Sequence, residues 1–108
     1  MNIALDLDEV IADTLSPLIL FHNETFGTHL KKEYFLSYNW WEVWGGTKEQ
    51  AIEKFFELTK SNYFSKVLPI AESVPAIQYL SKNNNLYVIT GRQQELLSVT
   101  TTWLNQYF

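Results

Sequence analysis

Cysteine is absent from the sequence, which excludes a disulfide framework and any metal site built on thiolates. Proline and glycine are scarce, with three and four residues in a chain of 108, and no linker or repeat rich in them interrupts it. Basic residues are also few: eight Lys and Arg stand against twelve Asp and Glu, a net charge of −4. Because nucleic-acid polymers are bound mainly through Lys and Arg, this balance argues against them. It permits a small phosphorylated ligand beside a metal ion.

Long apolar runs are missing too. No run approaches the length needed to span a bilayer, and the N-terminus lacks the basic region and apolar core of a signal peptide. These absences favour a cytoplasmic setting. The chain is nevertheless 46% hydrophobic and 16% aromatic, which is enough for the core of one ordinary domain.

The order of predicted elements indicates an α/β fold. We expect buried strands and helices in this sequence: a strand over 2–7, a helix over 16–26, a helix from 47, a short helix from 73, a strand over 86–90 and a last helix carrying residues 96–107. Strands that alternate with helical patterns favour a parallel sheet, although two strands are few for one.

Local signals mark the ends of these helices. Ser16 is a suitable N-cap before Pro17, and Gly27 supplies a stop. "TKEQ" at residues 47–50 has the form of a capping box, in which the cap and the residue three positions later bond to each other's backbone. We expect the helix that follows to bury this set: Ala51, Ile52, Phe55, Phe56 and Thr59.

Acidic residues interrupt the end of the first strand in "NIALDLDEVIADTL". Asp6 and Asp8 lie two positions apart, so in an extended chain they point to the same side. The crevice outside the carboxyl ends of parallel strands is where ligands bind in open α/β sheets. Two carboxylates there suit Mg²⁺, with one able to attack phosphorus and the other able to transfer protons. Taken alone, the pair is equally compatible with turn acids at a strand end.

The second strand, in "LYVITGR", ends on a hydroxyl residue. Thr90 would direct its hydroxyl into the same crevice, and the Gly91 amide would be free to approach an anion. Arg92 would steady a phosphate through two hydrogen bonds, or stand as a surface charge at a helix start. The two strand ends together point to phosphate chemistry more specifically than either does alone.

"DLDEVIADT" followed by "VITGR" resembles the first two motifs of the haloacid dehalogenase superfamily of phosphohydrolases. The resemblance implies an α/β fold with a Rossmann-like parallel sheet and a helical cap inserted after the first strand. It implies that Asp6 is the nucleophile that becomes an aspartyl-phosphate. Asp8 would be the acid/base and would also offer its carbonyl to Mg²⁺. Thr90 would bind the phosphoryl group.

Within the superfamily the chain is most similar to the 5′(3′)-deoxyribonucleotidases, through "DLDEVIAD", an aromatic segment, "LPIAESVPAIQYL" and "NNLYVITGR" in the same order. The resemblance implies a core formed by residues 1–14 and 73–108 and a helical cap at 15–72. It implies a Mg²⁺-dependent phosphomonoesterase that acts on nucleoside monophosphates.

One part of the superfamily pattern is missing. A lysine and a later acidic motif normally complete the site, yet after Arg92 the only charged residue is Glu95. We therefore expect the front part of the fold, with an incomplete sheet and an exposed strand edge that favours self-association, for example as a homodimer. The alternatives are a non-catalytic or truncated module that binds a nucleotide or a partner chain, and a phosphatase of another small metabolite.

The segment 34–44, "YFLSYNWWEVW", is rich in aromatic residues. These rings are either core of a small helical insert or a surface on which a nucleobase stacks. Candidates for base contact are these four: Tyr38, Trp40, Trp41 and Trp44. Trp40 and Trp41 are adjacent, so we do not expect both in the core. His22 lies on the apolar stripe of the first helix, and we expect a hydrogen-bonded core histidine there.

Overall fold

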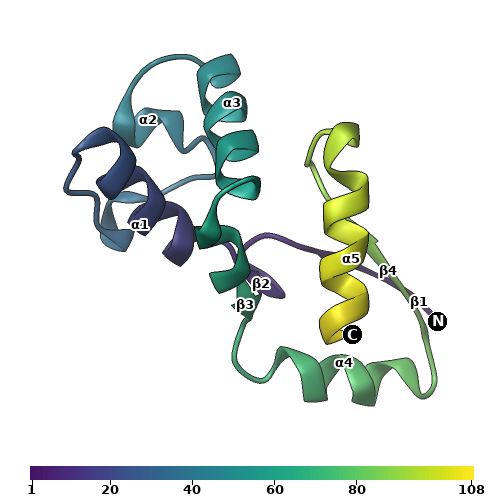
Figure 1. Cartoon of the computed structure of the whole chain (residues 1–108). Coiled ribbons are helices and arrows are strands. Elements are labelled where there is room, and N and C mark those ends of the chain that lie inside the picture. Colours follow the sequence, from purple (N-terminus) through teal and green to yellow (C-terminus); the bar gives the residue numbers. More distant parts are fainter. The chain divides into compact units, whose positions relative to one another are not determined.

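A computed structural model describes all residues, 1–108. The chain divides into two compact units (Figure 1). The strand-containing unit consists of Met1–Asp13 and Leu68–Phe108, and the helical unit of Thr14–Val67. No helix is both long and apolar enough to cross a membrane.

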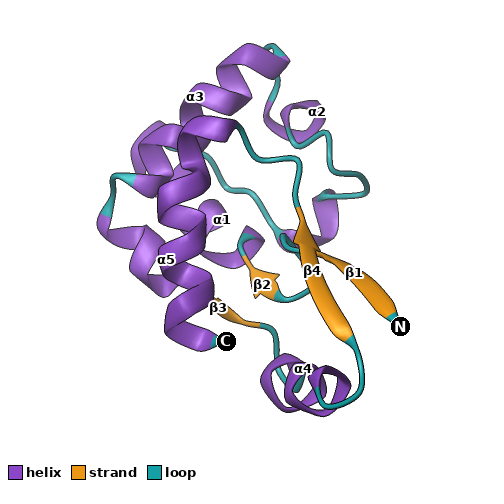
Figure 2. Ribbon diagram, turned by 90° about the vertical axis from the view of Figure 1, so that its right-hand side faces the viewer, coloured by secondary structure: helices purple, strands orange, loops and turns teal.

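Two parallel strands form the sheet of the strand-containing unit. β1 (Asn2–Asp6) pairs with β4 (Asn85–Ile89), so that Asp6 lies opposite Ile89 (Figure 2). The predicted parallel α/β arrangement is therefore present as a small mixed structure of helices and sheet. A second, antiparallel pair joins β2 (Ala12–Asp13) to β3 (Leu68–Pro69). Pro69 thus belongs to a two-residue strand.

Helices complete this unit. α4 (Ser73–Ser81) precedes β4, and a 3-10 turn (Gln94–Leu96) leads into α5 (Leu97–Tyr107). α5 supplies Trp103, which is buried and contacts the rings of Tyr107 and Phe108. The helix and strand starts predicted from the sequence agree with the structure to within one or two residues.

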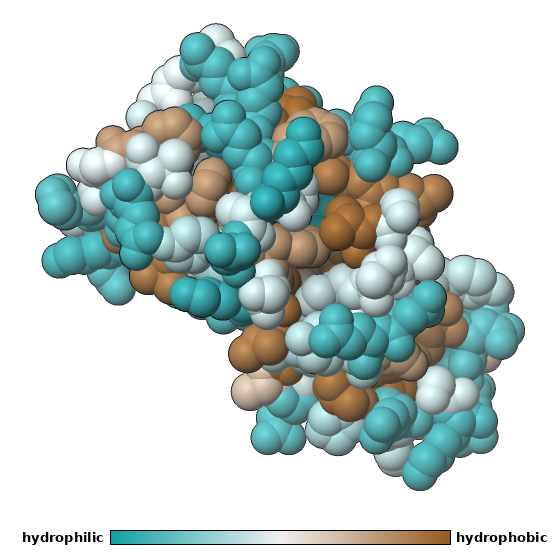
Figure 3. Space-filling model, in the orientation of Figure 1, coloured by the Kyte–Doolittle hydropathy of each residue, from teal (hydrophilic) through white to brown (hydrophobic).

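One face of the parallel strand pair is exposed. Ala4 and Tyr87 are paired, as are Asp6 and Ile89, and all four side chains are exposed. The alternate residues Ile3, Leu5 and Leu86 are partly buried. Parallel sheets are usually covered on both faces. Figure 3 shows hydrophobic atoms at the molecular surface. The exposed large hydrophobic residues include Tyr79, Ile89 and Leu97.

The helical unit packs around α1 (Leu15–Phe26) and α3 (Lys48–Thr59), with the short α2 (Trp41–Trp44) and two 3-10 turns (Lys32–Tyr34 and Asn62–Lys66). Its buried core cluster consists of four residues: Leu15, Leu18, Phe21 and Leu58. Aromatic side chains pack around this cluster, including Phe35, Trp40 and Trp44.

Helix ends agree with the sequence in two cases of three. The Thr47 hydroxyl accepts from the Gln50 amide at 3.2 Å while the Gln50 side chain accepts from the Thr47 amide at 2.9 Å, so the capping box is confirmed. Gly27 ends α1 in the left-handed region, at φ 66°, as expected of a glycine stop. The Ser16 cap is wrong: α1 begins at Leu15, and its N-cap residue is Thr14, whose side chain makes no capping hydrogen bond.

The buried face of α3 also differs from the expectation. Leu58 is completely buried, whereas the five residues predicted for this face are only partly buried. Leu58 lies three positions after Phe55 and so shares its side of the helix.

Candidate active site

The two strand ends that carry the predicted motifs lie side by side. Asp6 ends β1, its register partner Ile89 ends β4, and Thr90 follows directly. The chain thus brings residues separated by more than eighty positions to the same edge of the sheet. This confirms the expectation that the two motifs meet on neighbouring parallel strands.

Asp6 presents an exposed carboxylate at this edge. Its Oδ1 accepts a hydrogen bond from the Leu7 amide at 2.7 Å, which fixes the orientation of the side chain. In the strand register, Asp6 shares its face with the exposed Ile89. The carboxylate therefore stands where a small molecule can approach it.

A tight turn carries the chain from Asp6 to Asp8 and onward. The Leu7 carbonyl accepts from three successive amides, those of Val10, Ile11 and Ala12, at 3.0 to 3.3 Å. Glu9 adopts a positive φ of 62°, and its amide donates to the Ala12 carbonyl at 2.8 Å. A non-glycine residue in this region costs about 1 kcal/mol or more. The turn is thus held by backbone hydrogen bonds despite local strain.

Asp8 is held by Arg92. Arg92 Nη2 donates to Asp8 Oδ1 at 2.6 Å and Nε donates to Oδ2 at 3.1 Å, so one guanidinium engages both carboxylate oxygens. Nη1 donates to the Thr100 hydroxyl on α5 at 3.0 Å. The Arg92 side chain is only 6% exposed and that of Asp8 19%. Such a fork is directional as well as strong, and it sets the orientation of Asp8.

Thr90 and Gly91 form the turn after β4. The Thr90 hydroxyl oxygen accepts from the Arg92 amide at 3.2 Å, which bends the chain toward Asp8. A Cβ placed on Gly91 would meet no atom within 4 Å, so the space beside its backbone is open. Of the predicted phosphate-binding residues, Thr90 and Gly91 lie at the strand edge, whereas the Arg92 guanidinium contacts Asp8.

No group of three or more His, Cys, Asp or Glu side chains in the chain could hold a metal ion. The available oxygen donors still suit Mg²⁺ in kind, since it is commonly held by one or two carboxylates together with substrate phosphate and water. Asp6 has one carboxylate oxygen engaged by a backbone amide and offers the other. Both side-chain oxygens of Asp8 accept hydrogen bonds from Arg92. The family resemblance implies that the main-chain carbonyl of Asp8 would be its ligand to Mg²⁺.

The four aromatic candidates lie in different environments of the helical unit. Tyr38 is exposed, and Trp40 and Trp41 are partly buried. Trp40 packs against the core cluster and Trp41 is not among its neighbours. Trp44 is stacked on His22, with ring centroids 4.7 Å apart.

His22 is the core histidine that the helical spacing predicts. Its side chain is 1% exposed, and both ring nitrogens are hydrogen-bonded: Nδ1 to the Thr28 hydroxyl at 2.8 Å and Nε2 to Lys54 Nζ at 2.9 Å. Burial and then the Lys54 charge lower the pKa of His22 to about 4. Sequence reasoning did not find Lys54 or Thr100, because both partnerships join residues without a characteristic spacing.

A comparison with protein families gives one match over residues 1–108, the family described as 5′ nucleotidase, deoxy (Pyrimidine), cytosolic type C protein. The chain belongs to this family. The comparison with curated proteins finds no match. Membership in the nucleotidase family agrees with the resemblance carried by the two motifs and with the small parallel sheet.

Proposed function

We propose that this chain carries the catalytic strand ends of a Mg²⁺-dependent phosphomonoesterase that acts on deoxynucleoside monophosphates. The main structural support is the parallel register that sets Asp6 beside the end of β4 and the Thr90 turn. The family match over residues 1–108 supports nucleotide substrates, and its description names deoxy and pyrimidine compounds. We extend the proposal to pyrimidine deoxynucleotides and to a cytoplasmic setting.

Asp6 is proposed as the nucleophile. Its exposed carboxylate attacks the phosphorus, the bond to the nucleoside oxygen breaks, and an aspartyl-phosphate forms. Asp8 gives a proton to the leaving oxygen and later accepts one from the water that hydrolyses the intermediate. Thr90 and the Gly91 amide bind the phosphoryl oxygens. Mg²⁺, held by the Asp6 carboxylate and the Asp8 carbonyl, would offset the charge of the phosphate.

Arg92 acts mainly by positioning Asp8 in this proposal. Its guanidinium is committed to the two Asp8 oxygens and to Thr100, which keeps the acid/base oriented toward one side. An incoming phosphate competes with Asp8 for the same guanidinium. Arg92 therefore remains a candidate phosphate contact that requires rearrangement of this fork.

The helical unit, Thr14–Val67, is proposed as the cap. Its bounds lie within a few residues of those expected from the sequence, 15–72. Tyr38, Trp40 and Trp41 are the candidates for contact with the base, since stacking contributes about 1–3 kcal/mol per base. Trp44 is a weaker candidate, because one face of its ring is stacked on His22.

A second candidate function is a nucleotide-binding module without turnover. The observation that favours it is the fork between Arg92 and Asp8 together with the lack of a three-ligand acidic cluster. In that case the strand edge binds the phosphate and no acyl-phosphate forms.

Acid-quench trapping separates the two functions. The chain is mixed with dUMP and Mg²⁺, quenched in acid and digested, and the peptides are analysed by mass spectrometry. The phosphatase proposal predicts a phosphoryl group on the peptide that contains Asp6, absent from Asp6→Asn and retained in the control Glu95→Gln. Binding of dUMP by calorimetry with no phosphorylated peptide at any quench time would favour the binding module.

A further inference from the structure

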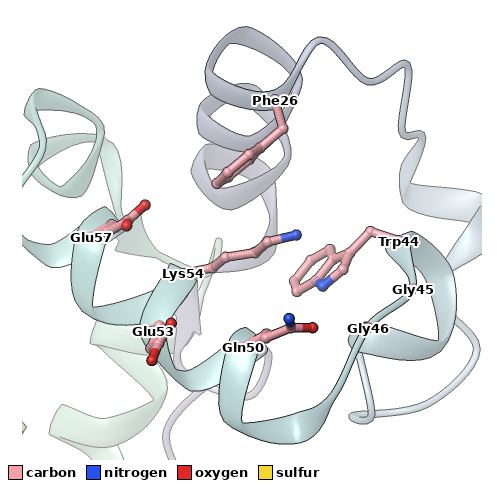
Figure 4. A pocket seen from close by; sticks show the side chains of 8 residues that line it. All are labelled: Phe26, Trp44, Gly45, Gly46, Gln50, Glu53, Lys54 and Glu57. Carbon is pink, nitrogen blue, oxygen red and sulfur yellow. The ribbon is translucent and has the colours of Figure 1, made fainter.

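A pocket of about 380 Å³ opens within the helical unit. It lies between the C-terminal end of α1, the turn after α2 and one side of α3 (Figure 4). Its lining combines two aromatic rings, a diglycine turn, one amide and three charged side chains. The residues are these: Phe26, Trp44, Gly45, Gly46, Gln50, Glu53, Lys54 and Glu57.

Lys54 reaches from α3 into this pocket. Its ammonium nitrogen lies 4.5 Å from the centroid of the Phe26 ring and 5.0 Å from that of Trp44 (Figure 4). No carboxylate lies within ion-pair distance of Lys54. Burial lowers the pKa of Lys54, while the charge of Glu57 acts in the opposite direction. This lysine is therefore a partly desolvated amine at the wall of an open pocket.

The hydrogen-bond chain behind Lys54 fixes the tautomer of His22. The Thr28 hydroxyl donates its only proton to Asn23 Oδ1 at 2.8 Å. The Thr28 oxygen must therefore accept the hydrogen bond that it shares with His22 Nδ1. His22 Nδ1 therefore carries the proton, and Nε2 presents its lone pair to Lys54 at 2.9 Å. Asn23 Oδ1 is itself fixed by the Leu30 amide at 2.8 Å.

This arrangement has the parts of an activated nucleophile: an amine, a neutral base within hydrogen-bond distance, and a third group that orients the base. We propose that Lys54 is a nucleophilic amine and that this pocket accepts a small neutral carbonyl compound, an aldehyde or ketone with a flat body, which condenses with Lys54 to an imine. The rings of Phe26 and Trp44 suit a flat body, and a neutral ligand avoids repulsion by the two glutamates.

The condensation balances without an oxidant or reductant. The Nζ lone pair attacks the carbonyl carbon, and the proton that Nζ loses reaches the carbonyl oxygen through water in the pocket while His22 Nε2 accepts a hydrogen bond from Nζ, giving a carbinolamine. The C–O bond then breaks, and the oxygen leaves as water with the second Nζ proton as the C=N bond forms.

Reductive labelling of the intact chain tests this proposal. The protein is incubated with benzaldehyde and sodium cyanoborohydride at pH 7, and the benzyl mark on each of the seven lysines is followed by peptide mass spectrometry. Because a lowered pKa raises the fraction of free amine, we expect Lys54 to be marked at least about five times faster than the mean of the exposed lysines. Lys60, in the same unit, is the internal reference.

Two variants test whether fast labelling of Lys54 depends on His22. His22→Gln retains an acceptor for Lys54 but removes the base, so it should lower the Lys54 rate toward that of Lys60 and leave the other lysines unchanged. Lys60→Arg should leave the Lys54 rate unaltered. A partly buried structural lysine would react more slowly than the exposed ones. Marking of Lys54 at or below the rate of Lys60 in the wild-type chain would therefore overturn the proposal.

Discussion

Acidification should destabilise the chain through His22 before most carboxylates are protonated. The pKa of His22 is about 4 in the fold against 6.5 for an unperturbed histidine, because the ring is buried and faces Lys54. Between these pH values the unfolded chain binds the additional proton, so the free energy of unfolding rises with pH. The contribution is fully present above pH 6.5 and is lost as the pH falls through 4.

The magnitude follows from the two pKa values. One pH unit corresponds to about 1.4 kcal/mol, so the stability lost through His22 between pH 7 and pH 4 is about 3 kcal/mol. A domain of this size is typically stable by only about 5–15 kcal/mol, so a change of this size is measurable.

Urea denaturation followed by circular dichroism at pH 7, 6, 5 and 4 measures the effect. Between pH 7 and pH 4, the free energy of unfolding of His22→Gln should fall by about 3 kcal/mol less than that of the wild-type chain. His29→Gln, which alters an exposed histidine of the same unit, should follow the wild-type curve. If the free energy of unfolding falls equally in the wild-type chain and in His22→Gln as the pH is lowered, the reasoning is refuted.

Three further substitutions test the fold and one tests the site. Thr47→Ala removes the capping hydroxyl of α3 and should lower the free energy of unfolding by about 1 kcal/mol in urea denaturation. An unchanged free energy of unfolding would show that the cap does not stabilise the helix. Gly46→Ala puts a side chain on a residue with φ 87°, and its Cβ would lie 2.3 Å from Gln50 Oε1. The substitution should lower the free energy of unfolding by more than about 1 kcal/mol in the same assay, and an unchanged stability would contradict this geometry. Leu58→Ala, at a fully buried position, should cost about 2–5 kcal/mol, and less than 1 would place Leu58 outside the core. Arg92→Lys keeps the charge but not the fork on Asp8, so phosphate release should fall while dUMP binding is largely kept; unchanged release would exclude positioning by Arg92.

Much of the site was predictable because its signals are local. An acidic pair ending one apolar strand and a hydroxyl residue ending another place Asp6 and Thr90 at one sheet edge once the strands are parallel. The capping box of α3 and the glycine end of α1 are likewise complete within a few residues. These features need no knowledge of how distant segments pack.

The missed features depend on packing between distant residues. Arg92 contacts Asp8 across 84 positions of the sequence, and Lys54 contacts His22 across 32. No helical or strand spacing predicts either contact. The sequence left Arg92 open between a phosphate contact and a surface charge, and the structure shows a buried partner of Asp8 instead. Leu58 was missed because the phenylalanines at positions 55 and 56 dominate the hydrophobic pattern of α3, whereas the structure buries Leu58 in the core cluster.

Phosphate release from deoxynucleoside monophosphates tests the central claim most directly. Five substrates, dUMP, dTMP, dCMP, dAMP and dGMP, are incubated with the chain in Mg²⁺, in EDTA, and with Asp6→Asn and Glu95→Gln. The account predicts release that requires both Mg²⁺ and Asp6, is retained in Glu95→Gln, and is faster for the three pyrimidine substrates. Release that persists in Asp6→Asn, or a folded chain that releases no phosphate from any of the five, would contradict it.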